Sequence, residues 1–254
     1  MALLTEIITV KELKEAQEIL SQEEIETAFS IAMREALLTK RAAIKTEEYN
    51  KKISNPDPKP EITSQAYYAW IYKKAKEEVR DFSLSEAESK IYNLLAMYFN
   101  NDPKFEAEGY SLNKGIMLYG GVGCGKTTTM KLFRDNPSQG YGVVECMAIA
   151  DGYKDKEIGA SIINTYSFSP AICFNDLGTE IETGTSSHYG NKKNVMAEII
   201  LNHYERNESK IFKMHFTTNC NAAKISLDYG NRVADRLKEM CNVISLEGIK
   251  SKRK

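Results

Sequence analysis

Residues 115–133, GIMLYGGVGCGKTTTMKLF, decide the fold. An apolar run comes first, a glycine-rich turn follows it, and helix-forming residues come next. The turn fits the spacing G-x-x-x-x-G-K-[ST], which is typical of loops that bind the phosphates of nucleotides. Glycines let several backbone N–H groups converge on phosphate oxygens, and the amino end of the following helix points at the same negative charge. We therefore predict a strand, a phosphate-binding loop and a helix over these residues.

Nine residues of this loop and the first helical turn are expected to bind the nucleotide. They are Gly120, Gly121, Val122, Gly123, Cys124, Gly125, Lys126, Thr127 and Thr128. Lys126 would reach the β- and γ-phosphates, and Thr127 has the hydroxyl that ligates Mg²⁺. Thr128 is placed to help with the α-phosphate.

The chain from Lys114 onward has the pattern of a parallel sheet covered by helices, because short apolar runs alternate there with helical segments. The runs are GIMLYG, YGVVECMA, AICFND, KIFKMHFTTN and NVISLEG. We predict one α/β nucleotide-binding domain with helices on both faces of the sheet.

The run AICFND, residues 171–176, is predicted to be the strand that brings an acid to the phosphate site. Its apolar part ends at Asn175 and Asp176. In one register, Asn175 takes the metal-facing place beside Thr127 and Asp176 activates water. In the other, Asp176 serves the metal and Glu180 approaches the water. Since asparagine contributes no charge, the first register predicts weaker Mg²⁺ binding and slower turnover.

Two C-terminal segments add candidate site residues. KIFKMHFTTN ends at Asn219, which could sense the phosphate if its strand lies beside the strand of the phosphate loop. Arg232 and Arg236 are four residues apart and share one helical face. Taken alone, such arginines are more typical of surface ion pairs than of a functional site.

Residues 1–60 are predicted to be a helical N-terminal segment that ends in a proline-rich linker. Helical periodicity covers residues 9–46, where Ser21 and Glu24 have the spacing of a capping box. The stretch NKKISNPDPKP, residues 50–60, contains three prolines, and we expect it to be non-helical.

Two helices over residues 61–110 are predicted to lead into a core over residues 111–254. The stripe of the first comprises Tyr67, Trp70, Ile71 and Ala75. The predicted capping pair of the second is Ser83 and Glu86.

Composition is typical of a soluble protein with 254 residues, 42% of them hydrophobic and 27% charged. The net charge of −1 excludes a broadly basic nucleic-acid coat but permits a local patch. No apolar run approaches the roughly 20 residues of a membrane helix, so we expect a cytoplasmic protein with no membrane partner. Its five cysteines form no C-x-x-C pair, which predicts reduced, buried residues.

Four motifs together resemble the AAA+ ATPases, specifically the helicase loaders and transposition helpers of the DnaC/IstB type. The motifs are GGVGCGKTT, CFNDLG, TTN and YGNRVADRLKEMCNVISLEG, and the resemblance covers about residues 85–250. The last motif is similar to the family's ending, a helix and a short strand followed by a basic tail with no lid domain. The resemblance implies an AAA+ P-loop domain over residues 61–254 that binds ATP and Mg²⁺ and hydrolyses the ATP.

The resemblance also implies roles for single residues. Asn219 would be the sensor of the phosphate, Arg236 the arginine finger inserted into a neighbouring subunit's ATP, and Arg232 a supporting arginine at that ATP. With Lys126 and Asp176, Asn219 and Arg236 complete the expected catalytic set, and the first register of the acidic strand is favoured. The family usually has two acids where this chain has Asn175 and Asp176, which puts the rate of hydrolysis in doubt rather than the binding of ATP.

An arginine finger that acts in trans implies a homo-oligomer, a ring or a spiral. By the same resemblance, residues 1–60 would grip a replicative helicase that is loaded onto single-stranded DNA, or a transposase. Lys192 and Lys193, in the polar loop 178–194, could contact single-stranded DNA or be solvated. Two other classes stay open: a nucleotide-gated scaffold with little turnover, which Asn175 favours, and a nucleoside or nucleotide kinase.

Overall fold

The computed structural model describes residues 19–54, 62–138, 140–155, 159–169, 171–182, 187–188, 191–192, 194–206 and 212–252. The chain divides into two compact units, Met1–Glu47 and Glu48–Lys254. Each unit is described by itself.

The N-terminal unit contains most of one long helix, α2 (Gln22–Ser54). The predicted capping box is confirmed, because the Ser21 N–H donates to Glu24 Oε2 at 2.8 Å and the Glu24 N–H donates to Ser21 Oγ at 3.3 Å. Several large apolar side chains of this helix are exposed, and they are Phe29, Ile31, Met33, Leu37 and Ile44.

The expected start of the linker at Asn50 is wrong, since α2 continues through Ser54. The physical reason is that a proline disfavours helix at the residue before it, and the first proline of the stretch is Pro56. Residues before Asn55 are therefore free to remain helical. Residues 55–61 lie outside the described residues.

The second unit is built around a five-stranded sheet. Its helices in chain order are α3 (Ser64–Glu78), α4 (Glu86–Phe99), α5 (Lys104–Ala107), α6 (Lys126–Phe133), α7 (Cys146–Tyr153), α8 (Gly159–Ser167), α9 (Thr179–Glu182), α10 (Val195–Arg206), α11 (Ala222–Tyr229) and α12 (Asn231–Met240). Its strands are β1 (Gly115–Tyr119), β2 (Gly142–Glu145), β3 (Ala171–Leu177), β4 (Ser187–His188), β5 (Asn191–Lys192), β6 (Lys213–Thr218) and β7 (Cys241–Ser245).

The strand order of the sheet is β2-β3-β6-β1-β7, and every neighbouring pair is parallel. β4 and β5 form a separate antiparallel pair. In the parallel sheet, the carboxyl ends of all five strands meet at one edge, so the loops after β1, β3 and β6 are neighbours.

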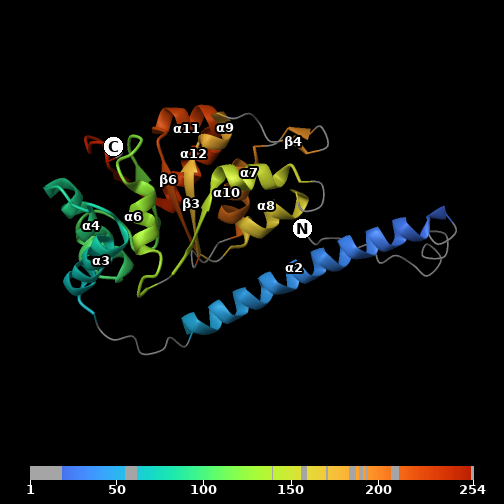
Figure 1. Cartoon of the computed structure of the whole chain (residues 1–254), viewed down its shortest axis with the longest axis horizontal. Coiled ribbons are helices and arrows are strands. Elements are labelled where there is room, and N and C mark those ends of the chain that lie inside the picture. Colours follow the sequence, from blue (N-terminus) through green and yellow to red (C-terminus); the bar gives the residue numbers. More distant parts are fainter. Residues whose placement is uncertain are drawn as a thin grey trace. The chain divides into compact units, whose positions relative to one another are not determined.

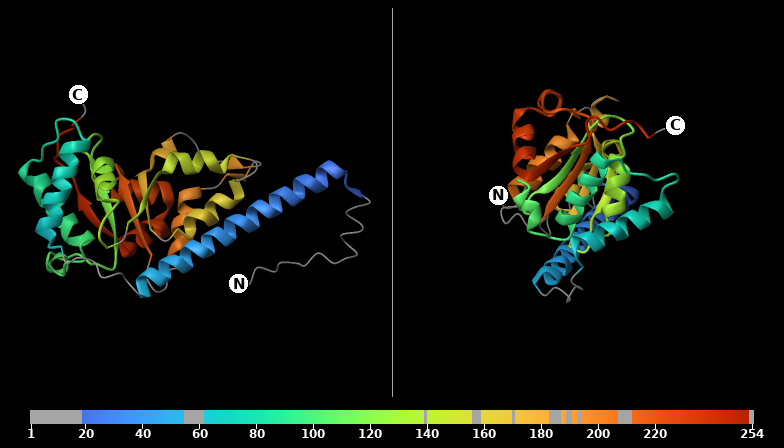
Figure 2. Two further views of the ribbon diagram at one scale, coloured as in Figure 1. Left: turned by 60° about the horizontal axis from the view of Figure 1, so that its bottom comes forward. Right: turned by 90° about the vertical axis from the view of Figure 1, so that its left-hand side faces the viewer.

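Helices cover both faces of the sheet, as predicted (Figure 1 and Figure 2). Figure 1 shows α3, α4 and α6 on one side of the sheet and α7, α8 and α10 on the other. Alternate residues of β1 point to opposite faces of the sheet. Ile116 and Leu118 pack in the core on the side of α3, α4 and α6, and Met117 packs in the core on the side of α7, α8 and α10. The predicted fold class, a P-loop α/β sheet flanked by helices, is therefore confirmed.

The two leading helices are present, but the predicted cap of the second is wrong. α4 begins two residues later, with Ser85 and Glu88 as its capping box. Both pairs fit the S-x-x-E spacing, so the sequence alone does not distinguish them, and Leu95 and Tyr98 of the predicted stripe are buried. The first stripe is buried as predicted except for Trp70, which is 48% exposed.

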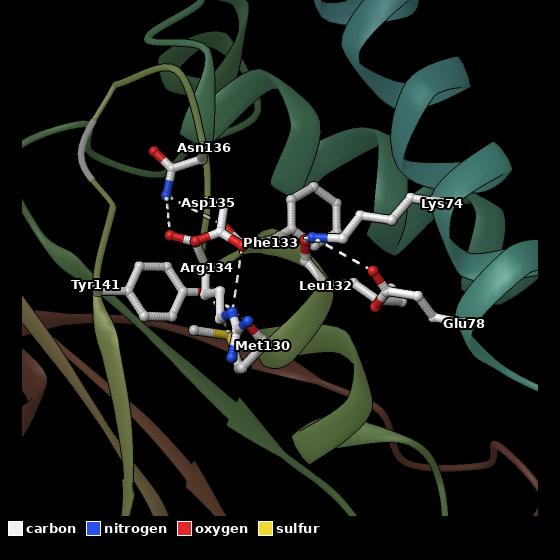
Figure 3. A network of polar contacts seen from close by, with 9 residues as sticks. All are labelled: Lys74, Glu78, Met130, Leu132, Phe133, Arg134, Asp135, Asn136 and Tyr141. Carbon is white, nitrogen blue, oxygen red and sulfur yellow. Dashed lines mark hydrogen bonds and ion pairs between the residues drawn. The ribbon is translucent and has the colours of Figure 1, made fainter.

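Contacts at the carboxyl end of α6 fix the helix that carries the phosphate loop (Figure 3). Lys74 of α3 donates to the carbonyl oxygen of Leu132 at 3.3 Å and pairs with Asp135 at 3.6 Å. The Tyr141 hydroxyl donates to the carbonyl oxygen of Met130 at 2.7 Å. A cation and a hydroxyl thus satisfy carbonyls that the end of a helix leaves without partners.

All five cysteines are buried and form no disulfide. None of the described helices is long and apolar enough to cross a membrane.

Candidate nucleotide-binding site

The predicted strand, loop and helix are β1, residues 120–125 and α6. Gly123 and Gly125 have φ angles of +81° and +93°, a region that favours glycine. Gly125 is the N-cap of α6 and has no side-chain cap, so the first N–H groups of this helix are left for a ligand.

Lys126 is the first residue of α6 and is only 5% exposed. Its ammonium donates to the carbonyl oxygens of Gly120 and Gly121 at 2.8 and 2.9 Å, and to Asn219 Oδ1 at 2.5 Å. These partners hold the ammonium against the loop without an ion pair among the described residues. A buried lysine whose partners are all neutral is a strong attractor for an anion.

A cavity of about 290 Å³ lies beside the loop. Seven of the nine predicted loop and helix residues line it, and they are Val122, Gly123, Cys124, Gly125, Lys126, Thr127 and Thr128. Asp176 and Asn219 also line it. The structure therefore brings most of the predicted site residues to one cavity.

Six apolar residues also line this cavity, and sequence reasoning missed them as site residues. They are Val79, Phe82, Ile91, Tyr92, Leu246 and Ile249. They come from the segment between α3 and α4, from α4 itself and from the chain after β7. Apolar lining residues beside a phosphate loop suit a flat heterocyclic base, because ligand pockets combine apolar walls with a few polar groups. In the sequence, the helical spacing of the apolar residues in α4 indicated core positions only.

Asp176 reaches the cavity because the edge of β3 is irregular. The β3–β6 register shifts between Phe174 and Leu177, and Asp176 has a φ of +56°. Aspartate tolerates this left-handed conformation better than most residues. The Asp176 N–H donates to Thr217 Oγ1 at 2.8 Å, which holds the turn in place.

Asn175 does not line the cavity. It is 1% exposed, its amide nitrogen donates to Glu145 Oε2 at 2.6 Å and to Asp176 Oδ2 at 3.1 Å, and its amide oxygen accepts from Thr217 Oγ1 at 2.7 Å. Glu145 is its neighbour in the β2–β3 register. Asn175 therefore lies away from the metal-facing place of the first register, and an amide is the side chain that satisfies two carboxylates and a hydroxyl together.

Glu180 does not reach the cavity either. It is 5% exposed, accepts from the Tyr229 hydroxyl, and accepts from the Gly178 N–H at 3.0 Å. Burial raises the pKa of Glu180, although hydrogen bonds from Tyr229 and Gly178 oppose the shift. Of the three candidates from the acidic strand, only Asp176 faces the phosphate loop.

Asn219 follows β6 directly, and β6 lies between β1 and β3. The strand before Asn219 therefore lies beside the strand of the phosphate loop, which is the placement that a residue sensing the phosphate requires. Its side-chain oxygen accepts from Lys126, and the two residues approach the cavity from neighbouring strands.

The two arginines lie apart from this cavity, on α12. Arg232 pairs with Glu205 at 2.6 Å. Arg236 pairs with Glu239 at 3.1 Å and stacks on the Tyr204 ring, with 4.3 Å between its guanidinium carbon and the ring centroid. Neither arginine therefore contributes to the lining of the cavity in its own chain.

Oxygen donors at the cavity fit a magnesium ion held together with phosphates. The Thr127 hydroxyl and the Asp176 carboxylate are hard ligands of the kind that Mg²⁺ prefers, and Mg²⁺ commonly uses one or two protein ligands beside phosphate and water. In the part of the chain that the structure describes, no group of three or more His, Cys, Asp and Glu could hold a metal. Such a site would therefore depend on the nucleotide.

The prediction of a DNA contact falls largely outside the described residues. Lys193 is not described, and of Lys192 only the backbone in β5 is.

Comparisons with known proteins give only distant similarities. No protein-family model matches the chain, and no curated protein matches it. Among solved structures, a crystal structure of DnaI has a TM-score of 0.47 and 15% identity, with 68% of this chain and 88% of that chain covered. A DNA replication initiation factor has a TM-score of 0.47 and 15% identity, with 67% and 49% covered. AMPPCP-bound DnaA from Aquifex aeolicus has a TM-score of 0.46 and 17% identity, with 67% and 48% covered.

The chain spans about half the length of the latter two structures. At these identities and TM-scores, the similarity does not establish what this chain binds or does.

Proposed function

We propose that the protein is an ATPase that binds ATP with Mg²⁺ in the cavity beside residues 120–125. The observation that carries this proposal is the convergence of Lys126, Asp176 and Asn219 on one cavity, at the carboxyl ends of three adjacent strands. A buried ammonium, the N–H groups at the start of α6 and the apolar lining residues together suit a phosphate chain joined to a base.

Each residue has a role in this proposal. Lys126 leaves the loop carbonyls and neutralises the β- and γ-phosphates, while the N–H groups of residues 123–128 bind phosphate oxygens. Thr127 and Asp176 would hold Mg²⁺, which supplies charge neutralisation on the phosphates when bound. Asn219 fixes the position of the attacking water or of the γ-phosphate.

Of the two acids that line the cavity, Glu88 is paired with Lys252, so Asp176 would also orient the water. Its carboxylate is within 3.1 Å of the Asn175 amide nitrogen. A neutral donor at this place fixes the carboxylate without removing its charge, whereas a second acid would compete with it. One acid for two tasks favours slow hydrolysis.

Arg236 is proposed to complete the site of a neighbouring subunit. It lies on an exposed face of α12 and is 30% exposed, and its partners Glu239 and Tyr204 are also surface groups. Leaving such an ion pair costs little, about 1 kcal/mol or less. The active form would then be a ring or spiral of identical subunits.

The biological role proposed is to load a replicative helicase onto single-stranded DNA. The order of the four sequence motifs supports it. The exposed apolar side chains Phe29, Met33 and Leu37, spaced four residues apart on α2, suit a partner grip. A transposition helper that grips a transposase would use the same surface.

A nucleotide-gated scaffold is the second candidate, and Asn175 favours it. With this residue committed to Glu145 and Thr217, the strand contributes one acid to the cavity rather than two.

The experiment is steady-state ATP hydrolysis with and without single-stranded DNA, measured for the wild type, Lys126→Ala, Asp176→Asn and Asn219→Ala. Turnover that each substitution reduces at least tenfold supports the ATPase. ATP binding without turnover, lost in Lys126→Ala, supports the scaffold. Transfer of phosphate to a nucleoside or nucleotide would contradict both and would point to a kinase. Pull-down with a helicase or a transposase separates the two partner classes.

A further inference from the structure

The chain after β7 turns back across the phosphate loop. The Leu246 N–H donates to the carbonyl oxygen of Tyr119 at 2.6 Å, and the Lys252 N–H donates to the carbonyl oxygen of Gly123 at 3.0 Å. A Cβ added at Gly120 would lie 3.0 Å from Leu246 Cβ. Two main-chain hydrogen bonds and a close packing contact therefore attach this segment to the loop.

The side chain of Lys252 anchors the segment at a third place. Its ammonium lies 2.5 Å from Glu88 Oε1 and donates to the carbonyl oxygen of Ser83 at 2.7 Å. It also lies over the Phe82 ring, 5.6 Å from the centroid. Ser83, Phe82 and Glu88 lie in or beside the start of α4, more than 160 residues away along the chain.

Lys252 neutralises the carboxylate of Glu88. The Glu88 side chain is 9% exposed and lines the nucleotide cavity. Oε2 accepts from the Ser85 N–H and hydroxyl, each at 2.8 Å, so Lys252 is the partner of Oε1. Burial acts to raise the pKa of Glu88, but hydrogen bonds from Lys252 and Ser85 outweigh it and hold this pKa below its usual value.

The charge arrangement bears directly on nucleotide binding. Without Lys252, a mostly buried carboxylate would remain in a cavity that has to accept a polyanion, and the two negative charges would repel each other. With Lys252 in place the pair is neutral, and the loop keeps its attachment at Gly123. Both effects favour the bound nucleotide.

We propose that residues 249–252 form a strap that belongs to the nucleotide site, in which Lys252 neutralises Glu88 and the main chain holds the phosphate loop. The inference rests on the proposed nucleotide binding. Because coupling between two binding events is reciprocal, the strap strengthens binding of the nucleotide and the nucleotide strengthens docking of the strap. Lys252 is a positioning residue in this account, since it acts through Glu88 and Gly123.

The experiment compares Mg-ATP affinity in four full-length proteins: the wild type, Lys252→Met, Glu88→Gln and the double variant. Lys252→Met should weaken binding about tenfold, because couplings of this kind are typically 5- to 150-fold. Adding Glu88→Gln should restore most of that loss, since no unpaired carboxylate remains. Lys250→Met, an exposed lysine outside the cavity lining, is the matched control and should bind as the wild type does.

The second readout is hydrogen–deuterium exchange of residues 119–128 without nucleotide. Lys252→Met should speed exchange there, and nucleotide should slow exchange of residues 246–252 in the wild type. A merely structural lysine would lower the melting temperature without the recovery in the double variant.

The outcomes are distinct. If the wild type binds Mg-ATP, Lys126→Ala does not, and Lys252→Met binds as tightly as the wild type, the proposed function stands and the strap is overturned. If the wild type does not bind, the proposed function fails. Exchange in the loop then decides alone: unchanged exchange in Lys252→Met overturns the strap's hold on the loop, and faster exchange supports it.

Discussion

Replacing Asn175 with aspartate restores the second acid that the sequence pattern lacks, and from the pattern alone it should speed ATP hydrolysis. The contacts of Asn175 predict the opposite. Its amide nitrogen donates to Glu145 at 2.6 Å and to Asp176 at 3.1 Å, so a carboxylate oxygen in that place faces two other carboxylates. Thr217 can still donate to the other oxygen. Two attractive contacts become repulsive ones.

The size of the effect follows from these distances. A hydrogen bond to a charged group contributes about 1.5–3 kcal/mol. Two like charges 4 Å apart repel by about 4 kcal/mol near a protein surface and about 1 kcal/mol in water. Because Glu145 is exposed, the lower end applies to that pair. We expect Asn175→Asp to destabilise the fold by about 3 kcal/mol, or about 6–12 °C in melting temperature for a unit of this size.

Urea denaturation and steady-state ATP hydrolysis provide the assay. Adding Glu145→Gln to Asn175→Asp moves the amide to β2 and the acid to β3, and it should recover about half of the lost stability, because the new carboxylate still faces Asp176. Glu145→Gln alone is the control and should cost less than about 1 kcal/mol, because a glutamine oxygen can still accept from Asn175. Asn175→Asp with wild-type stability, or with faster ATP hydrolysis, would refute this reasoning.

Three other outcomes are expected. Arg236→Ala should reduce ATP hydrolysis at least a hundredfold with an unchanged melting temperature. Mixing it with Lys126→Ala subunits should recover part of the activity, because the Lys126→Ala subunit supplies Arg236 and the Arg236→Ala subunit supplies an intact phosphate loop. No recovery would argue against action in trans. Burial, with the charge of Lys213, lowers the pKa of His215 to about 3, and its Nδ1 accepts from the Ile116 N–H at 3.0 Å. The folded protein keeps this ring neutral while the unfolded chain takes up a proton near pH 6.5, so the free energy of unfolding falls as pH drops from 6.5 towards 3. His215→Asn should be less stable at pH 8, and its free energy of unfolding, measured by urea denaturation, should fall less steeply with pH. An equally steep fall would contradict the assignment. Gly115→Ala should cost more than about 3 kcal/mol, since its Cβ would lie 1.7 Å from the carbonyl oxygen of Met214, whereas Gly142→Ala, with nothing within 4 Å of its Cβ, should cost less than about 1 kcal/mol in thermal unfolding; equal costs would show that the β1–β6 contact is looser than described.

The local features of the site could be predicted from the sequence. The phosphate loop needs a glycine-rich turn between a strand and a helix, and residues 115–133 contain all three parts. The position of Asn219 followed from the sheet, once parallel order placed β6 next to β1.

The remaining features depend on contacts between distant segments. The orientation of Asn175 is set by the register shift in β3 and by Glu145 on the neighbouring strand, neither of which the run AICFND reveals. The apolar lining of the cavity joins residues 79–92 to residues 246–249, and the apolar spacing in α4 alone predicts ordinary core. The basic tail was as consistent with a solvated end as with a phosphate contact, because a charge run does not identify its partner.

The most direct test of the central claim is calorimetric titration of Mg-ATP into the wild type and into Lys126→Ala, with thermal unfolding to show that both are folded. The account predicts saturable binding by the wild type and loss of binding in Lys126→Ala, because the buried ammonium is the cation closest to the phosphate loop. A folded wild type that binds no Mg-ATP, or equal binding by both proteins, would contradict it.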